Sequence, residues 1–204
     1  MKINKKILIL DYGVGNVKSL ACTLKKIASK VKISSSESEI SKADLLILPG
    51  VGSFPNCMNK LKKKGLDKIL LKEFKKNKQI LGICVGMQIM LKIGEEKKIT
   101  KGLEVLDGRL KKIDIKGKLP IIGWHKLKTK KNNLSQINNK YFYFIHSYEC
   151  ILEDKSSILS KYEYFSKKIV AIIRKKNFIG TQFHPEKSGN PGLLFLKTII
   201  NNQY

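Results

Sequence analysis

Short apolar runs alternate with amphipathic segments along the first half of the chain. Continuous apolar runs predict three buried strands: Lys6–Asp11, Asp44–Leu48 and Gln79–Ile83. Apolar residues at helical spacing predict three helices: Val17–Ala28, Leu61–Phe74 and, after the third strand, about Gly86–Ile93. Strands and helices that alternate at this pitch are typical of a mostly parallel sheet with helices on both faces.

The second half of the chain shows strand patterns without long helices between them. The predicted strands are Leu103–Ile115, Ile121–Leu127, Tyr141–Ile145, Ile169–Arg174 and Phe178–Phe183. The polar run Lys128–Lys140 predicts an exposed loop or hairpin tip, and a final helix is predicted over Gly192–Asn201, just after Pro191. We therefore expect an α/β fold: a mostly parallel open sheet flanked by helices, with an antiparallel-rich second half, in a single domain over residues 1–204.

The length of 204 residues suits one domain with a substantial core. Hydrophobic residues make up 42% of the chain and charged residues 28%, a balance typical of globular rather than disordered proteins. The apolar run Ile7–Leu10 is too short for a signal peptide. No segment approaches the ~20 apolar residues of a membrane-spanning helix. We expect a cytoplasmic protein.

The four cysteines, Cys22, Cys57, Cys84 and Cys150, lie far apart and show no CxxC pairing. Without an export signal, this spacing favours neither a disulfide framework nor a zinc site, so we expect no bound metal. The ordinary interpretation of a lone cysteine is a small buried side chain. That interpretation holds for three of the four, and Cys84 needs separate consideration.

The formal net charge of +25 raises the possibility of nucleic-acid binding. Only Arg109 and Arg174 are arginines, however, and the many lysines are scattered along the whole chain beside many Ile and Asn residues. Base and phosphate recognition favours the bidentate arginine side chain. A surplus of Lys, Ile and Asn is what A/T-rich codons produce. Specific nucleic-acid binding therefore stays a remote alternative.

The segment Gly82-Ile83-Cys84-Val85-Gly86 follows a predicted strand and opens a predicted helix. Small residues on both sides of a nucleophile let the chain turn sharply and lift that side chain above the edge of the sheet. A helix N-terminus favours the reactive thiolate, and the N–H of Val85 is a candidate oxyanion donor. A core cysteine at a glycine-flanked strand end is the equally weighted alternative.

His184 and Glu186 lie two residues apart in the segment Gly180–Glu186. In extended chain both side chains face the same way, so Glu186 can accept a hydrogen bond from one imidazole nitrogen while the other faces a nucleophile. A cysteine, a histidine and an acid are the groups that acyl transfer through a thioester requires. A third segment, Leu48–Ser53, closes a strand with a glycine-containing loop. By itself it indicates a turn, but its Val51 or Gly52 N–H groups are candidate donors to the same oxyanion.

These three segments, in this order, resemble the class I, triad-type glutamine amidotransferases over nearly the whole chain. Several segments are similar to the glutaminase subunits of imidazole glycerol phosphate synthases in particular. They are Asp11–Asn16, Pro49–Gly52, Gly82–Gln88, Gly123-Trp124, His146–Tyr148 and His184–Ser188.

The resemblance implies that Cys84 is the nucleophile, that His184 is a general base and then acid, and that Glu186 orients His184. It also implies an oxyanion hole completed by the loop with Val51 and Gly52. The residues that it implies for binding the amino-acid end of glutamine are Gln88, Glu96, Ser147 and Tyr148, the last two through their backbone. No cofactor is implied.

The resemblance further implies a partner, a (β/α)₈-barrel synthase that receives ammonia and makes imidazole glycerol phosphate and AICAR in histidine biosynthesis. Asp11–Asn16 would face this partner. The chain departs from the family pattern at His125, where the family usually has asparagine and which we expect near the partner interface. It also departs at Tyr148-Glu149 and at Ser188–Pro191. A related subunit that supplies ammonia for amidation of a surface-polysaccharide sugar is the alternative that these departures leave open.

Overall fold

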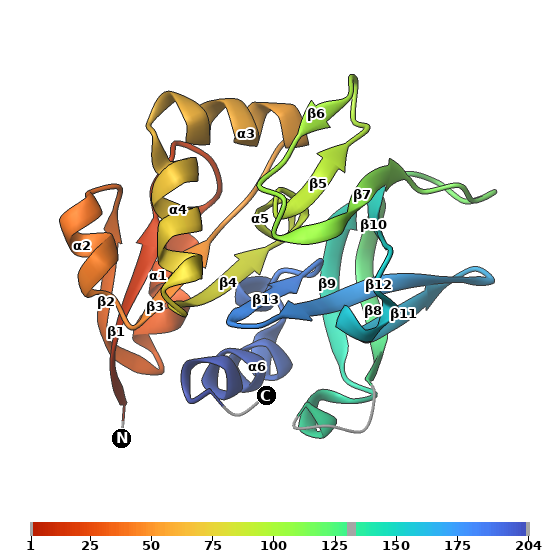
Figure 1. Ribbon diagram of the computed structural model, residues 1–204. Coiled ribbons are helices and arrows are strands. Elements are labelled where there is room, and N and C mark those ends of the chain that lie inside the picture. The colour runs from red at the N-terminus through yellow and green to blue at the C-terminus, as the bar shows by residue number, and fades with distance from the viewer. Residues whose placement is uncertain (1, 130–133, 203–204) are drawn as a thin grey trace.

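A nine-stranded sheet lies at the centre of the molecule in a computed structural model that describes residues 2–129 and 134–202 (Figure 1). In spatial order its strands are β2 (Ala28–Ser34), β1 (Ile3–Leu10), β3 (Leu45–Leu48), β4 (Gln79–Ile83), β13 (Phe178–Thr181), β12 (Lys167–Lys175), β11 (Ile158–Tyr164), β8 (Ile121–Thr129) and β9 (Tyr141–His146). Neighbours from β2 to β13 pair in parallel. Neighbours from β13 to β9 pair antiparallel, so the expected α/β architecture is confirmed.

A second, four-stranded sheet stands beside the antiparallel half of the first (Figure 1). Its strands, in spatial order, are β10 (Tyr148–Leu152), β7 (Leu106–Lys112), β5 (Leu91–Gly94) and β6 (Thr100–Lys101). The helices are α1 (Val17–Lys25), α2 (Glu37–Lys42), α3 (Phe54–Lys63), α4 (Leu66–Lys75), α5 (Val85–Gln88) and α6 (Gly189–Ile200). Every residue of β3, β4 and β13 is buried, as expected of parallel strands covered on both faces.

The stretch predicted around Leu61–Phe74 is helical, but it belongs to two helices rather than one. Helix α3 already begins at Phe54, and the break before α4 falls at Gly65. Gly65 has a φ of 65°, a left-handed conformation that glycine adopts without steric cost and that ends a helix. Apolar composition alone did not reveal this break, since buried apolar residues lie on both sides of it.

Two further helices end earlier than predicted. The helix expected over Val17–Ala28 ends at Lys25, and Ala28 begins the edge strand β2. The helix expected over Gly86–Ile93 is the short α5, and its second half is instead β5, which pairs in parallel with β7. Pairing with another part of the chain decides the conformation of such a short apolar segment.

At the other end of the chain, α6 begins at Gly189 rather than after Pro191. Proline is tolerated there because the first turn of a helix leaves its N–H groups without partners in the helix. The polar run Lys128–Lys140 is an exposed loop only in part. Residues 130–133 lie outside the described residues, whereas Leu134 and Ile137 are fully buried around a 3₁₀ turn. The strand Gln79–Ile83 is present with the predicted ends and the other expected strands with shifted ends, whereas β2, α2, β6, β10 and β11 were not predicted.

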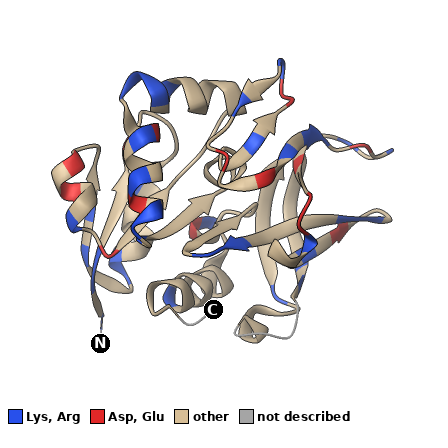
Figure 2. Cartoon of the chain, viewed as in Figure 1, with Lys and Arg blue, Asp and Glu red and all other residues tan. Residues whose placement is uncertain are grey.

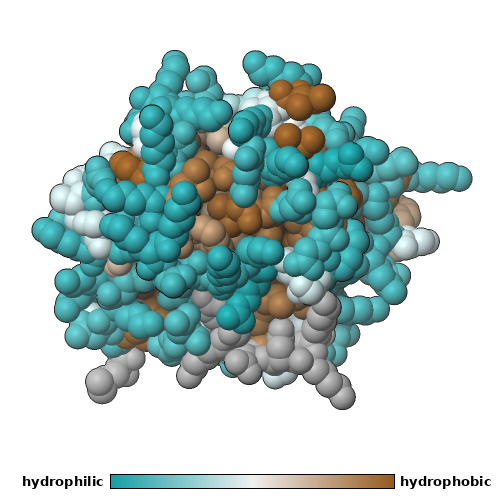
Figure 3. Space-filling view, viewed as in Figure 1, coloured by the Kyte–Doolittle hydropathy of each residue, from teal (hydrophilic) through white to brown (hydrophobic). Residues whose placement is uncertain are grey.

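Lysine and arginine residues are spread over most elements of the chain, rather than gathered into one segment (Figure 2). Hydrophilic side chains cover most of the same face (Figure 3). Within the described part of the chain, no helix is long and apolar enough to cross a membrane.

We expect Gly86→Ala to destabilise the fold strongly, because a Cβ at this position would lie 1.9 Å from the carbonyl oxygen of Leu48. Overpacking of this kind costs ~3 kcal/mol or more when backbone must move. The matched control is Gly65→Ala, where a Cβ meets nothing within 4 Å and only the positive φ opposes it, at ~1 kcal/mol. Denaturant unfolding of both variants measures the difference. Equal losses would contradict the packing argument.

Candidate active site

Cys84 occupies a strained turn between β4 and α5. Its backbone has φ 53° and ψ −114°, a combination that costs a non-glycine residue of order 1–3 kcal/mol. The flanking glycines allow the turn, since a Cβ on Gly82 would lie 2.6 Å from the oxygen of Gly86. The turn leaves the Cys84 side chain 5% exposed at the floor of a pocket. The sharp, glycine-flanked turn expected at Cys84 is present.

The helix that follows Cys84 is a single turn, Val85–Gln88. The expected stabilisation of a thiolate by a helix N-terminus is therefore small, because a macrodipole needs aligned peptides over several turns. A nearby cation is a larger source of positive potential, and His184 supplies one.

His184 follows β13, the strand that pairs in parallel with β4. The Cys84 N–H donates to the Thr181 carbonyl at 2.7 Å, which ties the two strand ends together. The backbone of His184 is held from the other side, where its N–H donates to the Tyr143 carbonyl at 2.9 Å. Its carbonyl accepts a 2.6 Å hydrogen bond from the Ser188 hydroxyl, which itself accepts the Tyr143 N–H at 3.0 Å. The backbone of His184 is thus fixed by β9 and by the turn that follows His184.

The imidazole of His184 lies between an acid and the thiol. Its Nδ1 is 2.9 Å from Oε1 of Glu186, and both side chains are almost buried. Burial lowers the pKa of His184, but hydrogen bonds to Cys84 and to Glu186 outweigh it and raise the pKa to about 10. His184 therefore carries a proton at neutral pH, and a protonated imidazole beside a thiol favours thiolate chemistry. The expected Cys–His–Glu arrangement is assembled in space.

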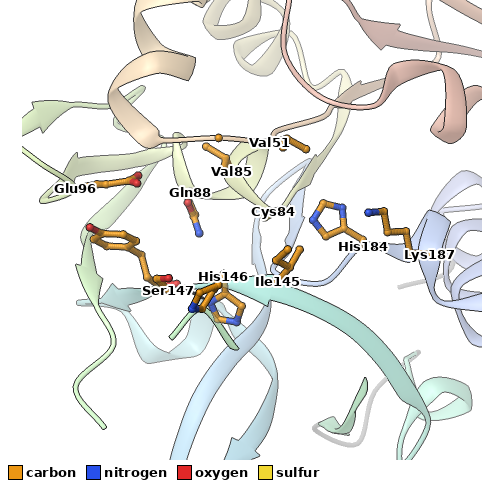
Figure 4. A pocket seen from close by; sticks show the side chains of 13 residues that line it. Val51, Cys84, Val85, Gln88, Glu96, Ile145, His146, Ser147, His184 and Lys187 are labelled. Atoms are coloured by element: carbon orange, nitrogen blue, oxygen red, sulfur yellow. Dashed lines mark hydrogen bonds between the residues drawn. The ribbon is translucent and has the colours of Figure 1, made fainter. Parts of the chain in front are cut away.

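A pocket of about 300 Å³ opens above Cys84 (Figure 4). Of the residues expected at the site, it is lined by Val51, Gly52, Cys84, Val85, Gln88, Glu96, Ser147, Tyr148 and His184. Glu186 lies behind His184 and does not line it. The remaining lining residues are Pro120, Ile145, His146 and Lys187.

The loop expected to complete an oxyanion hole is anchored from below. The Tyr12 hydroxyl donates to the Pro49 carbonyl at 2.5 Å, and the Cys57 thiol donates to the Val51 carbonyl at 3.8 Å. Val51 itself is half exposed at the pocket, and Gly52 has a φ of 104°. The loop backbone packs directly on α5, since a Cβ on Gly50 would lie 2.2 Å from the backbone nitrogen of Gly86 in that helix. The loop therefore lies beside the turn that carries the nucleophile.

The residues expected to bind glutamine have definite partners of their own. Glu96 accepts the N–H of Phe54, the first residue of α3, at 2.7 Å. The carbonyls of Ser147 and Tyr148 accept from the Ile113 N–H at 2.9 Å and from Nδ1 of His146 at 2.8 Å.

One residue at the thiol was not predicted. Gln182 is fully buried, and its Nε2 donates to Sγ of Cys84 at 3.6 Å, an ordinary length for a bond to sulfur. Its Oε1 accepts from Nε2 of Gln88 at 3.0 Å. Its position two residues before His184 was visible in the sequence, but an alternation argument places it on the same side as His184 without saying what it touches.

His125, which we expected near a partner interface, packs inward. Its ring contacts those of Phe144, Tyr162 and Tyr164, with centroids 5.1–5.8 Å apart. Its neighbour Trp124 is half exposed on the opposite face of β8. Burial lowers the pKa of His125. The departure from the family pattern at this position is therefore a change in an aromatic cluster behind the pocket.

Among the described residues, no cluster of three or more His, Cys, Asp or Glu side chains forms a metal site.

Comparison with known proteins identifies the family. Residues 8–200 match the family described as glutamine amidotransferase class-I. The imidazole glycerol phosphate synthase subunit HisH of Oceanobacillus iheyensis is 39% identical over 194 residues, covering 94% of this chain and 96% of that protein. The HisH subunit of Lactococcus lactis is 40% identical over 199 residues, covering 96% and 98%.

Solved structures agree on the fold. A crystal structure of a glutamine amidotransferase superposes with a TM-score of 0.75 at 15% identity, over 96% of this chain and 98% of that one. PurLQS from Thermotoga maritima gives the same TM-score at 17% identity, over 99% and 100%. The sequence match over most of the chain, on a fold shared with solved amidotransferases, shows that this chain belongs to the class-I glutamine amidotransferase family.

Proposed function

We propose that this chain is the glutaminase subunit of an imidazole glycerol phosphate synthase, a single domain over residues 1–204 that releases ammonia from glutamine for histidine biosynthesis. The observation that carries the proposal is the placement of Cys84 and His184 in one pocket, with Glu186 hydrogen-bonded to His184 from behind. The two HisH relatives favour histidine biosynthesis over ammonia supply for a surface-polysaccharide sugar.

The proposed reaction begins with attack of the Cys84 sulfur on the side-chain carboxamide carbon of glutamine. The carbonyl oxygen takes the electron pair and becomes an oxyanion, for which N–H groups of Val85 and of Val51 or Gly52 are the proposed donors. When the oxyanion collapses, the C–N bond breaks and protonated His184 gives its proton to the departing nitrogen, which leaves as ammonia. A glutamyl thioester and a neutral imidazole remain.

Water completes the cycle. Neutral His184 takes a proton from a water molecule as its oxygen attacks the thioester carbon. The C–S bond then breaks, its electron pair returns to sulfur, and glutamate leaves. Glu186 keeps Nδ1 of His184 as the donor to its own carboxylate, so that the other ring nitrogen exchanges the proton in both steps. No step needs a metal or a cofactor.

For glutamine binding we propose Gln88, Glu96 and the backbone at Ser147 and Tyr148. All four residues line the pocket above Cys84. The carboxylate of Glu96 is held in place by the Phe54 N–H and offers negative charge to the substrate's α-ammonium group.

We propose that the protein works in the cytoplasm. The reaction needs a reduced thiol, which that compartment maintains.

For the partner we propose a (β/α)₈-barrel synthase subunit, in a heterodimer through which ammonia passes without entering bulk water. Support comes from large exposed apolar side chains next to the pocket. Ile122 and Trp124 are 59% and 51% exposed on β8, and Ile145, 38% exposed on β9, also lines the pocket. Exposed apolar side chains gathered in this way mark interaction sites. Asp11–Asn16, at the end of β1, is proposed to contact the same partner.

We expect Cys84→Ala to abolish glutamine hydrolysis, a loss of roughly 10⁴-fold or more, because no other group can form the thioester. Cys22→Ala is the control, since Cys22 is an exposed thiol on α1. A coupled assay for glutamate, with the partner and its acceptor substrate present, measures both. Hydrolysis that survives in Cys84→Ala would disprove the proposed function.

The pH dependence of kcat/KM tests the effect of Glu186 on the pKa of His184, because kcat/KM reports the groups of the free enzyme. Since the leaving nitrogen needs the His184 proton, kcat/KM is expected to fall only as pH rises toward 10, the pKa of His184. Glu186→Gln removes a group that raises this pKa, so the alkaline fall moves to lower pH by ~1–2 units. Circular dichroism at each pH verifies that the fold is retained. An unmoved alkaline limb in Glu186→Gln would exclude the proposed role of Glu186.

We expect Trp124→Ala to weaken association with a histidine-pathway barrel subunit by ~10-fold or more, since buried tryptophans dominate binding energy at interfaces. Phe165→Ala is the matched control, because Phe165 is an aromatic side chain, 66% exposed, in the turn between β11 and β12. Isothermal titration calorimetry measures both affinities. Equal affinity for wild type and Trp124→Ala would remove this surface from the proposed interface.

A further inference from the structure

The side chain of Gln182 joins the nucleophile to the wall of the pocket. It is fully buried, and its two polar atoms meet Sγ of Cys84 and Nε2 of Gln88. A buried amide without hydrogen bonds costs several kcal/mol in an apolar environment, so such groups are found where partners are supplied. Here the two recorded partners are the proposed nucleophile and a proposed substrate-binding residue. Neither is part of a sheet ladder.

The backbone fixes where this amide lies. The Gln182 N–H donates to the Ala171 carbonyl of β12 at 2.9 Å, beyond the last residue of β13. The two residues next to Gln182 are also joined: the Thr181 hydroxyl donates to the Phe183 carbonyl at 3.0 Å, which holds the bend that leads to His184. Gln182 therefore enters the site from the same segment as His184 and cannot move independently of it.

Charge decides the orientation of both amides. A thiolate can accept a hydrogen bond but cannot donate one, so Gln182 must present its NH₂ group to Sγ of Cys84. Its oxygen then faces Gln88, which must present its own NH₂ group in turn. The oxygen of Gln88 is left as an acceptor at the pocket that it lines. The charge on the Cys84 sulfur thus determines which polar atom of Gln88 is available at the pocket.

We propose that Gln182 is a further catalytic residue: its N–H stabilises the negative Cys84 sulfur, and its oxygen orients Gln88 toward bound glutamine. This inference rests on the proposed glutaminase function. Unlike His184, Gln182 keeps its protons through the whole cycle. When the thioester C–S bond breaks and its electron pair returns to sulfur, the Gln182 N–H is still present to receive that charge, while His184 has just been protonated by water.

Two substitutions separate the two halves of the proposal. Gln182→Met keeps the length of the side chain but removes the donor and the acceptor. Gln182→Glu keeps an acceptor for Gln88 but replaces the N–H beside sulfur with negative charge. The first readout is the rate at which iodoacetamide alkylates Cys84 at pH 7, followed by peptide mass spectrometry so that other cysteines do not contribute. The second is the pair kcat and KM for glutamine.

Alkylation of Cys84 is expected to slow about tenfold or more in Gln182→Met, because a hydrogen bond to a charged group is lost, and further in Gln182→Glu. We expect kcat to fall by a similar factor in both. KM should rise about fivefold in Gln182→Met, where Gln88 loses its partner, and should stay within about twofold of wild type in Gln182→Glu.

Gln79→Met is the matched control. Gln79 is a buried glutamine in the same sheet, and its Nε2 bonds to the Ile199 carbonyl, away from the pocket. Its loss is expected to lower the unfolding temperature without slowing alkylation of Cys84. If Gln182→Met alkylates as fast as wild type, or slows no more than Gln79→Met, the proposal is overturned. Should Gln182→Met not fold, alkylation in the near-isosteric Gln182→Glu decides the question in the same way.

Failure of this inference is distinguishable from failure of the glutaminase function. The Cys84→Ala variant tests the function by loss of hydrolysis, whereas the alkylation rate of Cys84 needs no turnover. Loss of hydrolysis in Cys84→Ala together with wild-type alkylation in Gln182→Met would reject the role of Gln182 alone.

Discussion

The backbone hydrogen bond from Cys84 to Thr181 fixes the geometry on which the rest of the site depends. It continues the parallel pairing of β4 with β13 by one residue beyond the strand end. Active sites of α/β sheets form where neighbouring parallel strands end, because the chain leaves the sheet there and side chains converge. The thiol of one strand and the imidazole of the next are therefore held at one edge by the sheet itself, and not by flexible loops.

Maintaining this geometry requires backbone that leaves no room for side chains. The left-handed conformation of Cys84 is strained, and Gly50, Gly82 and Gly86 meet backbone atoms where a Cβ would stand. A rigid, fully buried group of central strands holds these contacts together. The same close packing places the loop with Val51 next to the nucleophile. This strained backbone lowers the stability of the region but positions the side chains around Cys84 accurately, which is usual for an active site.

Much of the fold and the grouping of Cys84, His184 and Glu186 could be predicted from the sequence. The strand Gln79–Ile83 was predicted to the residue because a continuous apolar run ends at a glycine-flanked turn. The edge strand β2 was missed because lysines alternate with its few apolar residues, and the break at Gly65 was missed because apolar residues lie on both sides of it. The contacts of Gln182 were missed for another reason: both partners lie in the distant segment Cys84–Gln88, and local spacing carries no information about contacts between distant segments.

The two strands that carry the thiol and the imidazole are neighbours in space but far apart in the chain, with strands β5 to β12 between them. Synthesis on the ribosome therefore produces the segment around Cys84 long before His184 exists. During that interval the chain bears a cysteine without its base, and a product interrupted before β13 would have neither the imidazole nor the Thr181 carbonyl that holds the turn. Because His184 follows the last strand, the chain cannot hydrolyse glutamine until nearly all of the sheet has been made.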